Sequence, residues 1–313
     1  MRGLSWSRDG RRWPNRRASR FVDAGGLHWH VQVMGHGPSL LLVHGIGATT
    51  HSFRGLMPLL ASRFTVIAPD LPGHGFTQAA TGRRVSLPGM AAGVADLLTA
   101  LGAKPTTAVG HSAGAAIVVR MCLDGQITPS RLVSLNGALL PLDGLPASVF
   151  APFAGFLASL SPVHPLLAWR ADRVLVDRLL AGTGSTLDAK GTTLYARLAR
   201  CPGHLGGALT MMANWDLEPI ERDLPRLSVP LTLIVGAHDR TIRPTEAERA
   251  RHLLPSAEIV TLPSLGHLAH EERPSLVAEQ ILARAAGSPA PPPLARSLLA
   301  HLADLRTRWP RHT

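Results

Sequence analysis

Short apolar runs alternate with helix-like segments along most of the chain. Seven runs bounded by turn residues are typical of strands, at residues 27–33, 40–43, 65–68, 106–109, 131–135, 231–235 and 258–262. Between them, the pattern of helices is found at residues 90–101, 113–123 and 245–254. Strands that alternate with helices in this way predict an α/β fold with a mostly parallel central sheet flanked by helices.

One long interruption follows the run that ends at Leu135. About ninety residues pass before the next strand-like run, and helical pieces separated by Pro and Gly occupy 150–160, 171–180, 192–200 and 205–214. Helices inserted into an α/β core are typical of a cap. We therefore predict an α/β core at residues 21–138 and 224–286, and a helical cap at residues 139–223.

Both ends of the chain are basic, whereas the body between them is nearly neutral. The formal net charge is +11, of which residues 1–20 carry +6 and residues 290–313 carry +3. A charge confined to the ends argues against a nucleic-acid partner. Two interpretations of the basic ends remain. They are solvated tails, or they are segments that dock on an acidic partner or on an anionic membrane surface. We divide off residues 1–20 as a basic N-terminal segment and residues 287–313 as a Pro-rich linker with a C-terminal helix.

Cysteine usage and one uncharged stretch limit where the protein resides. Only Cys122 and Cys201 are present, so a disulfide framework and a cysteine zinc site are excluded, and a reducing compartment such as the cytoplasm is expected. Residues 144–169 contain no charged side chain, but four prolines interrupt them and break any spanning helix. We expect this stretch to be buried or to line a pocket, with peripheral contact at the inner membrane as the alternative.

A candidate nucleophile lies between a predicted strand and a predicted helix. Gly110-His-Ser-Ala-Gly114 has the form G-x-S-x-G directly after the apolar run that ends at Val109. A serine on such a tight turn is exposed at the carboxyl end of the sheet and at the N-terminus of a helix, which favours developing negative charge. We therefore expect Ser112 to be the nucleophile. The alternative is a helix N-cap, which leaves Gly114 unexplained.

The ends of the last two predicted strands supply an acid and a base. Asp239 follows the strand at 231–235, and His267 follows the strand at 258–262. The chain order Ser, Asp, His is the one that this architecture uses for a catalytic triad. His270 is the competing base, but Glu271 and Glu272 after it indicate the start of a helix.

Two backbone N–H groups are expected to stabilise an oxyanion. One belongs to Ala113, directly after the nucleophile, and the other to Ile46, in the glycine-bearing loop after the run 40–43. Gly45 and Gly47 in that loop are not a dinucleotide fingerprint, because position 50 is Thr. A nicotinamide-dependent oxidoreductase is therefore disfavoured.

Five motifs occur in one order along the chain. They are His44-Gly45, Asp70-Leu-Pro-Gly-His-Gly75, Gly110-His-Ser-Ala-Gly114, Gly236-Ala-His-Asp239 and Gly266-His-Leu-Ala-His-Glu-Glu-Arg-Pro274. Together they resemble the α/β-hydrolase superfamily over most of residues 21–285. The resemblance implies a mostly parallel sheet flanked by helices, with a helical cap inserted after the sixth strand of that fold.

A narrower resemblance rests on segments outside these motifs. They include Trp13-Pro-Asn-Arg16, Ser134-Leu-Asn-Gly-Ala-Leu-Leu-Pro141 and Met211-Met-Ala-Asn-Trp-Asp-Leu217. They resemble the magnesium chelatase accessory proteins of bacteriochlorophyll biosynthesis. That resemblance implies a role near magnesium insertion into protoporphyrin, with chelatase subunits or a tetrapyrrole intermediate as partners. It does not imply that this chain inserts the metal, because no P-loop is present.

The predicted cap supplies candidates for a substrate pocket. Met211, Met212 and Trp215 recur at near-helical spacing, and they either pack in the core or line a site for a large, flat apolar ligand. We also expect His111, beside the nucleophile, to line this pocket. The sequence indicates no cofactor and no resident metal, since His267 and His270 do not form H-E-x-x-H. His164 and His204 of the predicted cap are candidates to ligate a porphyrin-bound metal, but lone histidines rarely do so.

These features leave two hypotheses from different classes. The first is a serine hydrolase that acts on a small apolar molecule through an ester, a thioester or an activated carbon–carbon bond. The second is a non-catalytic scaffold that binds a porphyrin or a chelatase subunit.

Overall fold

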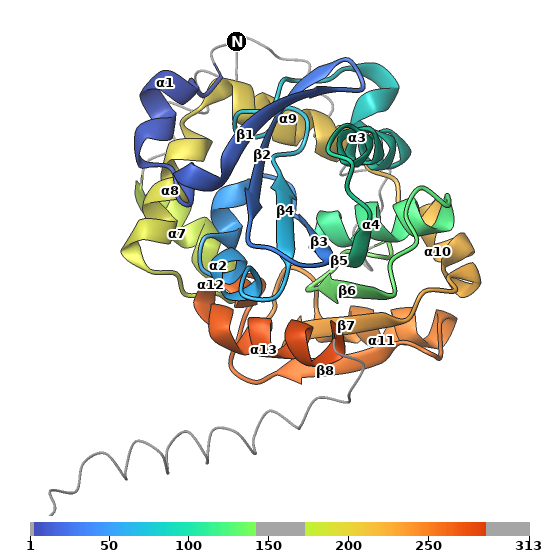
Figure 1. Ribbon diagram of the computed structural model, residues 1–313. Helices are drawn as coiled ribbons and strands as arrows, with labels where there is room; N and C mark the ends of the chain where they lie inside the picture. The colour runs from blue at the N-terminus through green and yellow to red at the C-terminus, as the bar shows by residue number, and fades with distance from the viewer. Residues whose placement is uncertain (1–2, 142–172, 286–313) are drawn as a thin grey trace, which may run out of the picture.

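A single mixed β-sheet forms the centre of the protein (Figure 1). The computed structural model describes residues 3–141 and 173–285. Within them the strand order is β1-β2-β4-β3-β5-β6-β7-β8. The strands are β1 (Ser19–Ala24), β2 (Leu27–Met34), β3 (Ser39–Val43), β4 (Thr65–Pro69), β5 (Pro105–His111), β6 (Arg131–Leu135), β7 (Leu231–Gly236) and β8 (Glu258–Leu262).

The sheet is parallel except at one edge. β1 pairs with β2, and β2 with β4, in antiparallel register, whereas every pair from β4 to β8 is parallel. The predicted α/β class and the mostly parallel sheet are therefore confirmed. β1 is a strand that the hydrophobic pattern did not predict. It lies at the edge, where Arg20 and Asp23 are exposed, and an edge strand need not show a continuous apolar run.

Helices cover both faces of the sheet. On one face lie α3 (Leu87–Ala100), α4 (Ala113–Leu123) and α11 (Pro244–Leu253), and on the other lie α2 (Leu56–Leu60) and α13 (Pro274–Ala285). Successive side chains of β3 point to opposite faces of the sheet and pack against both layers of helices. Leu41 and Val43 pack with α3 and α4, whereas Leu40 and Leu42 pack with α2 and α13. Burial on both faces is the reason that the inner strands read as continuous apolar runs.

Four α-helices lie between β6 and β7 in the described part of that stretch. They are α7 (Arg173–Gly182), α8 (Ala189–Ala199), α9 (Pro202–Ala213) and α10 (Glu218–Asp223), and a short α12 (Ala269–Glu272) follows β8. Helical structure was expected at 171–180, 192–200 and 205–214, and α7, α8 and α9 occur there with shifted ends. The helix expected at 150–160 and the expected C-terminal helix lie outside the described residues.

The basic N-terminal segment packs against the protein. Residues 3–18, here called the N-terminal strap, contain α1 (Trp6–Asp9) and two short 3₁₀ turns. Trp13 is only 3% exposed and packs on Leu194 and Leu198 of α8. Asp9 joins the two segments as well, because it accepts hydrogen bonds from Arg8 and from Arg197 of α8.

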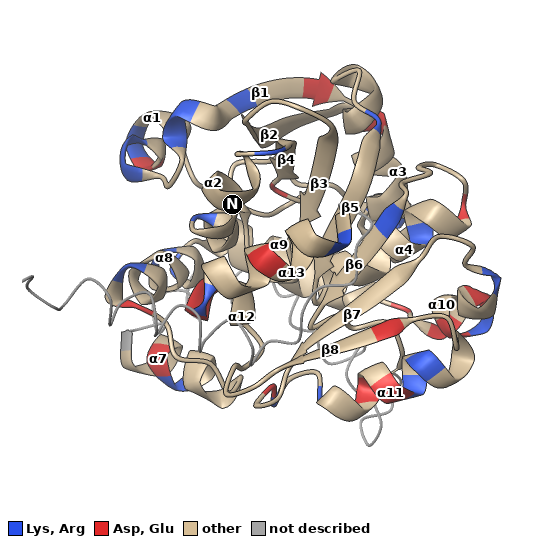
Figure 2. Ribbon diagram, turned by 60° about the horizontal axis from the view of Figure 1, so that its bottom comes forward, with Lys and Arg blue, Asp and Glu red and all other residues tan. Residues whose placement is uncertain are grey.

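The strap keeps its charge on the outside. Arg8, Arg11, Arg12, Arg16 and Arg17 are exposed, and Figure 2 shows the basic positions along α1 and the start of β1. The strap is therefore an ordered basic surface over α8, at least across residues 3–18. Among the described residues, no helix is both long and apolar enough to cross a bilayer.

Candidate active site

Ser112 lies on a strained turn between β5 and α4. Its φ of 52° and ψ of −121° are outside the regions that L-residues usually adopt. The flanking glycines are needed for steric reasons. A Cβ on Gly110 would collide with the backbone of Gly114 and Ala115, and a Cβ on Gly114 would collide with the carbonyl of Val43. The G-x-S-x-G pattern therefore follows from close packing of β5, α4 and β3.

Asp239 and His267 form a buried pair beside this turn. The Nδ1–H of His267 donates to Oδ2 of Asp239 at 2.8 Å. Oδ1 of Asp239 accepts from the N–H groups of Thr241 and Ile242, at 2.8 and 2.9 Å. Both oxygens are thus held, and the carboxylate has a fixed plane. With Nδ1 engaged, the remaining ring nitrogen of His267 is Nε2, the atom that accepts a proton in a triad.

His267 and His270 have different surroundings. His267 lines the same pocket as Ser112, whereas His270 is fully buried against Phe53 and His111 and does not appear among the lining residues. Burial, together with the neighbouring His267 and Arg54, lowers the pKa of His270 to about 3. Between the two candidates for a base, only His267 contacts Asp239.

His111 connects the nucleophile turn to the base. Its Nε2–H donates to the main-chain carbonyl of His267 at 2.9 Å, and its ring packs against the rings of His267 and His270. Burial holds the pKa of His111 well below its usual range, so the ring is neutral. His111 also lines the pocket, as expected from the sequence.

The loop that carries Ile46 is fixed by buried histidines. His44 donates from Nδ1 to the carbonyl of Gly45 at 2.8 Å and accepts from the N–H of Leu71 at 2.9 Å. His204 of α9 donates from Nε2 to the carbonyl of Gly47 at 3.0 Å. Ile46 and Ala113 line the same pocket as Ser112.

His204 has no ring nitrogen left for a metal. Its Nδ1 accepts from the N–H of Gly75 at 3.2 Å, while its Nε2 is engaged with Gly47. Burial lowers the pKa of His204 to about 4. Across residues 3–141 and 173–285, no group of three or more His, Cys, Asp or Glu side chains is arranged to hold a metal ion. His164 lies outside the described residues.

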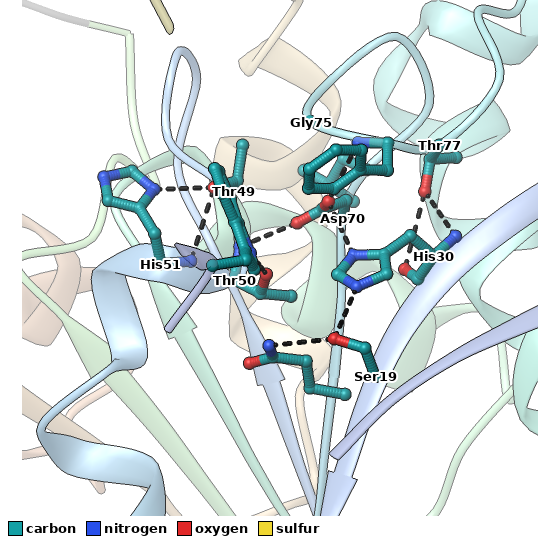
Figure 3. Close-up of polar contacts among 12 residues, drawn as sticks. Ser19, His30, Thr49, Thr50, His51, Asp70, Gly75 and Thr77 are labelled. Carbon is teal, nitrogen blue, oxygen red and sulfur yellow. Dashed lines mark hydrogen bonds and ion pairs between the residues drawn. The ribbon is translucent and has the colours of Figure 1, made fainter. Parts of the chain in front are cut away.

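Asp70 anchors the loops behind the site (Figure 3). Its Oδ2 accepts from Nδ1 of His30 at 2.8 Å, and its Oδ1 accepts from the N–H of Thr50 at 2.7 Å. Burial alone would raise the pKa of Asp70, but His30 and the N–H donors outweigh it and hold the pKa well below its usual range. This buried carboxylate ties β2 and β4 to the loop after β3.

The pocket in front of Ser112 is mostly apolar, with a volume of about 470 Å³. Met212 and Trp215 from the segment after β6 line it, as expected. Met211 does not: it is fully buried in the core with α3 and α4, because adjacent helical positions point about 100° apart. The expectation that Met211 lines the pocket is therefore not met.

The sequence analysis also missed several residues of this pocket. Tyr195 of α8 lines it, and its hydroxyl donates to Glu271 at 2.7 Å. Arg54 forms an ion pair with Glu271 and another with Asp188 just before α8. Nothing in the local pattern marked Tyr195, because its contact partner lies 76 residues away in the chain.

Asn136 is another residue that the sequence analysis missed, although it does not line the described part of the pocket. It directly follows β6, and it bonds both Asp239 and the loop of His267. Its position gives a signal that was available in the sequence, since Ser112, Asp239 and His267 also follow the ends of parallel strands. Side chains at these ends meet at one edge of the sheet.

The comparisons with known proteins agree with this fold. The family model of the alpha/beta hydrolase family matches residues 40–280. The chain therefore belongs to the α/β hydrolase family, as its five motifs indicated.

Within that family, one relative is far more similar to the chain than a shared fold requires. The chain is 39% identical over 262 residues to the magnesium-chelatase 30 kDa subunit of Rhodobacter capsulatus, covering 83% of this chain and 91% of that protein. It is 28% identical to the uncharacterized hydrolase YugF of Bacillus subtilis, covering 83% of this chain and 94% of that protein. The narrower resemblance to a magnesium-chelatase protein is thus confirmed.

Solved structures show the same fold. An alpha/beta hydrolase fold protein from Burkholderia ambifaria superposes with a TM-score of 0.70 at 23% identity, covering 85% of this chain and all of that one. The epoxide hydrolase CorEH gives a TM-score of 0.71, also at 23% identity, covering 86% of this chain and 98% of that one. At this identity the likeness concerns the fold alone.

Proposed function

We propose that this protein is a serine hydrolase of small apolar molecules that serves as an accessory protein of magnesium chelatase in bacteriochlorophyll biosynthesis. The observation that carries the hydrolase part is His267, which is hydrogen-bonded to Asp239 and lines one apolar pocket with Ser112 on its strained turn. The accessory role rests on the similarity to the magnesium-chelatase 30 kDa subunit. In this proposal residues 139–223 form a cap over the core and supply Met212 and Trp215 to the pocket.

In the first half of the reaction, His267 Nε2 takes the proton of the Ser112 hydroxyl as Oγ attacks the substrate carbonyl. Asp239 stabilises the imidazolium through Nδ1–H. The N–H groups of Ala113 and Ile46 hold the negative oxygen of the tetrahedral intermediate. His267 then returns the proton to the leaving group as the intermediate collapses to an acyl-enzyme.

In the second half, water attacks the acyl group while His267 accepts one of its protons. The acid product leaves, and the Ser112 hydroxyl is restored with the proton from His267. Esters, thioesters and activated carbon–carbon bonds all fit this sequence of steps, which needs no cofactor. The apolar lining of the pocket favours an apolar substrate.

Labelling with a fluorophosphonate probe tests this mechanism. Wild-type protein is expected to react covalently, whereas Ser112→Ala is expected to lose all labelling because the attacking oxygen is gone. Ser62→Ala removes an exposed serine far from the pocket and serves as the matched control. Labelling of Ser112→Ala at the wild-type rate would refute the assignment of the nucleophile.

A second candidate function is a non-catalytic scaffold that binds a tetrapyrrole or a chelatase subunit. The name of the relative, a chelatase subunit, favours it. Complementation of a deletion strain separates the two functions. If Ser112→Ala restores bacteriochlorophyll and Trp215→Ala does not, the scaffold function is supported; the hydrolase function requires that Ser112→Ala fail. Docking of the basic strap on an anionic membrane stays a prediction.

A further inference from the structure

Asn136 is a buried amide whose hydrogen-bonding groups are all engaged around Asp239 and His267. The side chain is 1% exposed. Its Nδ2 group donates to Oδ2 of Asp239 and to the carbonyl of Gly266, both at 2.8 Å, and its Oδ1 accepts from the N–H of Gly236 at 3.2 Å. One side chain thus touches the end of β7, the acid after β7 and the residue before the base.

The partners of Asn136 demand an amide at this position. A carboxylate and a main-chain carbonyl only accept hydrogen bonds, so the NH₂ group must face Asp239 and Gly266. The N–H of Gly236 only donates, so the amide oxygen must face it. An aspartate of the same shape would place a carboxylate against a carboxylate, and a shorter side chain would lose all three hydrogen bonds.

The backbone conformation of Asn136 also favours asparagine at this position. Its φ of 47° is in the left-handed region, which asparagine tolerates better than most residues. The residue follows β6, which pairs with β7, and β7 in turn pairs with β8. Its amide reaches both the loop after β7 that carries the acid and the loop after β8 that carries the base. Asn136 does not line the described part of the pocket and is not placed to contact substrate.

We propose that Asn136 is a positioning residue that fixes Asp239 and His267 in one geometry, an inference that rests on the proposed hydrolase function. It shares Oδ2 of Asp239 with His267, and so turns that oxygen toward the Nδ1–H of the imidazole. At the same time it holds the main chain at Gly266, from which the His267 side chain starts. The amide therefore determines the relative position of an acid and a base that belong to different loops.

Two variants that tolerate a left-handed backbone test this inference. Asn136→Gly removes the amide without backbone strain, and Asn136→Asp keeps its shape but replaces the donor by a carboxyl group. With p-nitrophenyl butyrate as substrate, both variants are expected to lower kcat roughly ten- to a hundredfold through a misplaced base. KM should stay within about twofold, because Asn136 does not line the described part of the pocket.

The pH dependence distinguishes positioning from general damage. In Asn136→Asp the two facing carboxyl groups share a proton at low pH and repel each other once it is lost. The ratio of variant to wild-type kcat should therefore fall as pH rises, whereas for Asn136→Gly it should change little with pH. Asn15→Gly and Asn15→Asp are matched controls, since Asn15 is also left-handed but lies in the N-terminal strap.

The downfield ¹H NMR resonance of the His267 Nδ1 proton provides a readout independent of turnover. It should shift or disappear in both Asn136 variants and persist in both Asn15 variants. Folded Asn136 variants that keep kcat within about twofold and retain this resonance would overturn the inference. If the wild type neither hydrolyses esters nor labels at Ser112, the hydrolase function fails, and the resonance alone decides the role of Asn136.

Discussion

At the scale of single residues, the site depends on close contacts that only small side chains allow. Gly45 is the clearest case outside the Gly-x-Ser-x-Gly turn. A Cβ there would lie 2.8 Å from Cβ of Ser112 and 3.3 Å from Nδ1 of His111. The glycine therefore lets the loop of Ile46 approach the nucleophile.

Gly45→Ala should displace Ser112 or the Ile46 loop while leaving the fold intact. We expect the maximal rate of fluorophosphonate labelling to fall roughly tenfold or more, because a displacement near 1 Å misaligns the reacting groups. Gly55→Ala is the matched control, since its Cβ would be similarly close to a side chain, Pro274, outside the pocket. Equal labelling rates for the two variants would show that Gly45 has no such role.

At the scale of elements, the strands that were predicted correctly from the sequence are the buried ones. The inner strands are buried on both faces, so their apolar runs were visible, and β6 and β8 have the bounds that were predicted. β1 was missed because most of its residues are exposed or half-buried at the edge of the sheet, so it has no apolar run. The strap was expected to be a basic tail, but its apolar anchor Trp13 is matched by Leu194 and Leu198, which lie far away in the chain.

The strap should stabilise α8 on the core through Trp13. Besides its apolar contacts, the indole N–H donates to the hydroxyl of Thr50 at 3.2 Å. Trp13→Ala is expected to lower the free energy of unfolding by about 3 kcal/mol, as measured by urea denaturation. Arg12→Ala, at an exposed neighbouring position, should change it by less than about 0.5 kcal/mol. A Trp13→Ala effect as small as that of the control would contradict the anchoring role.

At the scale of the whole molecule, the protein holds an unusual set of neutral histidines. In six buried histidines the pKa is lowered, mainly because burial disfavours the charged ring: His44, His51, His74, His111, His204 and His270. They lie behind and around the pocket, where they fix the loops by hydrogen bonds and ring contacts. Their neutrality links the stability of the fold to pH.

The fold should lose stability as pH falls below about 6.5. In that range the unfolded chain takes up protons that the folded chain rejects, until pH approaches the folded pKa values, about 4 for His204 and about 3 for His270. Each such histidine then costs about 1 kcal/mol per pH unit. Urea midpoints measured at pH 7.5, 6.5 and 5.5 should decrease in that order.

One substitution isolates the contribution of a single ring. His270→Phe keeps an aromatic ring beside Phe53 and removes one titrating group, so the decline between pH 6.5 and 5.5 should become shallower. His252→Gln, at an exposed position, should leave the decline unchanged. Midpoints that are constant across this range in the wild type would show that burial of the histidines does not govern acid stability.

The sequence by itself determined the α/β class, the parallel strands and the strand ends that carry Ser112, Asp239 and His267. These features depend on local patterns: apolar runs, turn glycines and the order of motifs along the chain. The tertiary structure decided what depends on contacts between distant segments. It separated Met211 from Met212, folded the basic strap onto α8, and placed the amide of Asn136 between acid and base. Such contacts join residues more than a hundred positions apart: the position of Asn136 at a strand end was visible in the sequence, but the groups that it binds were not.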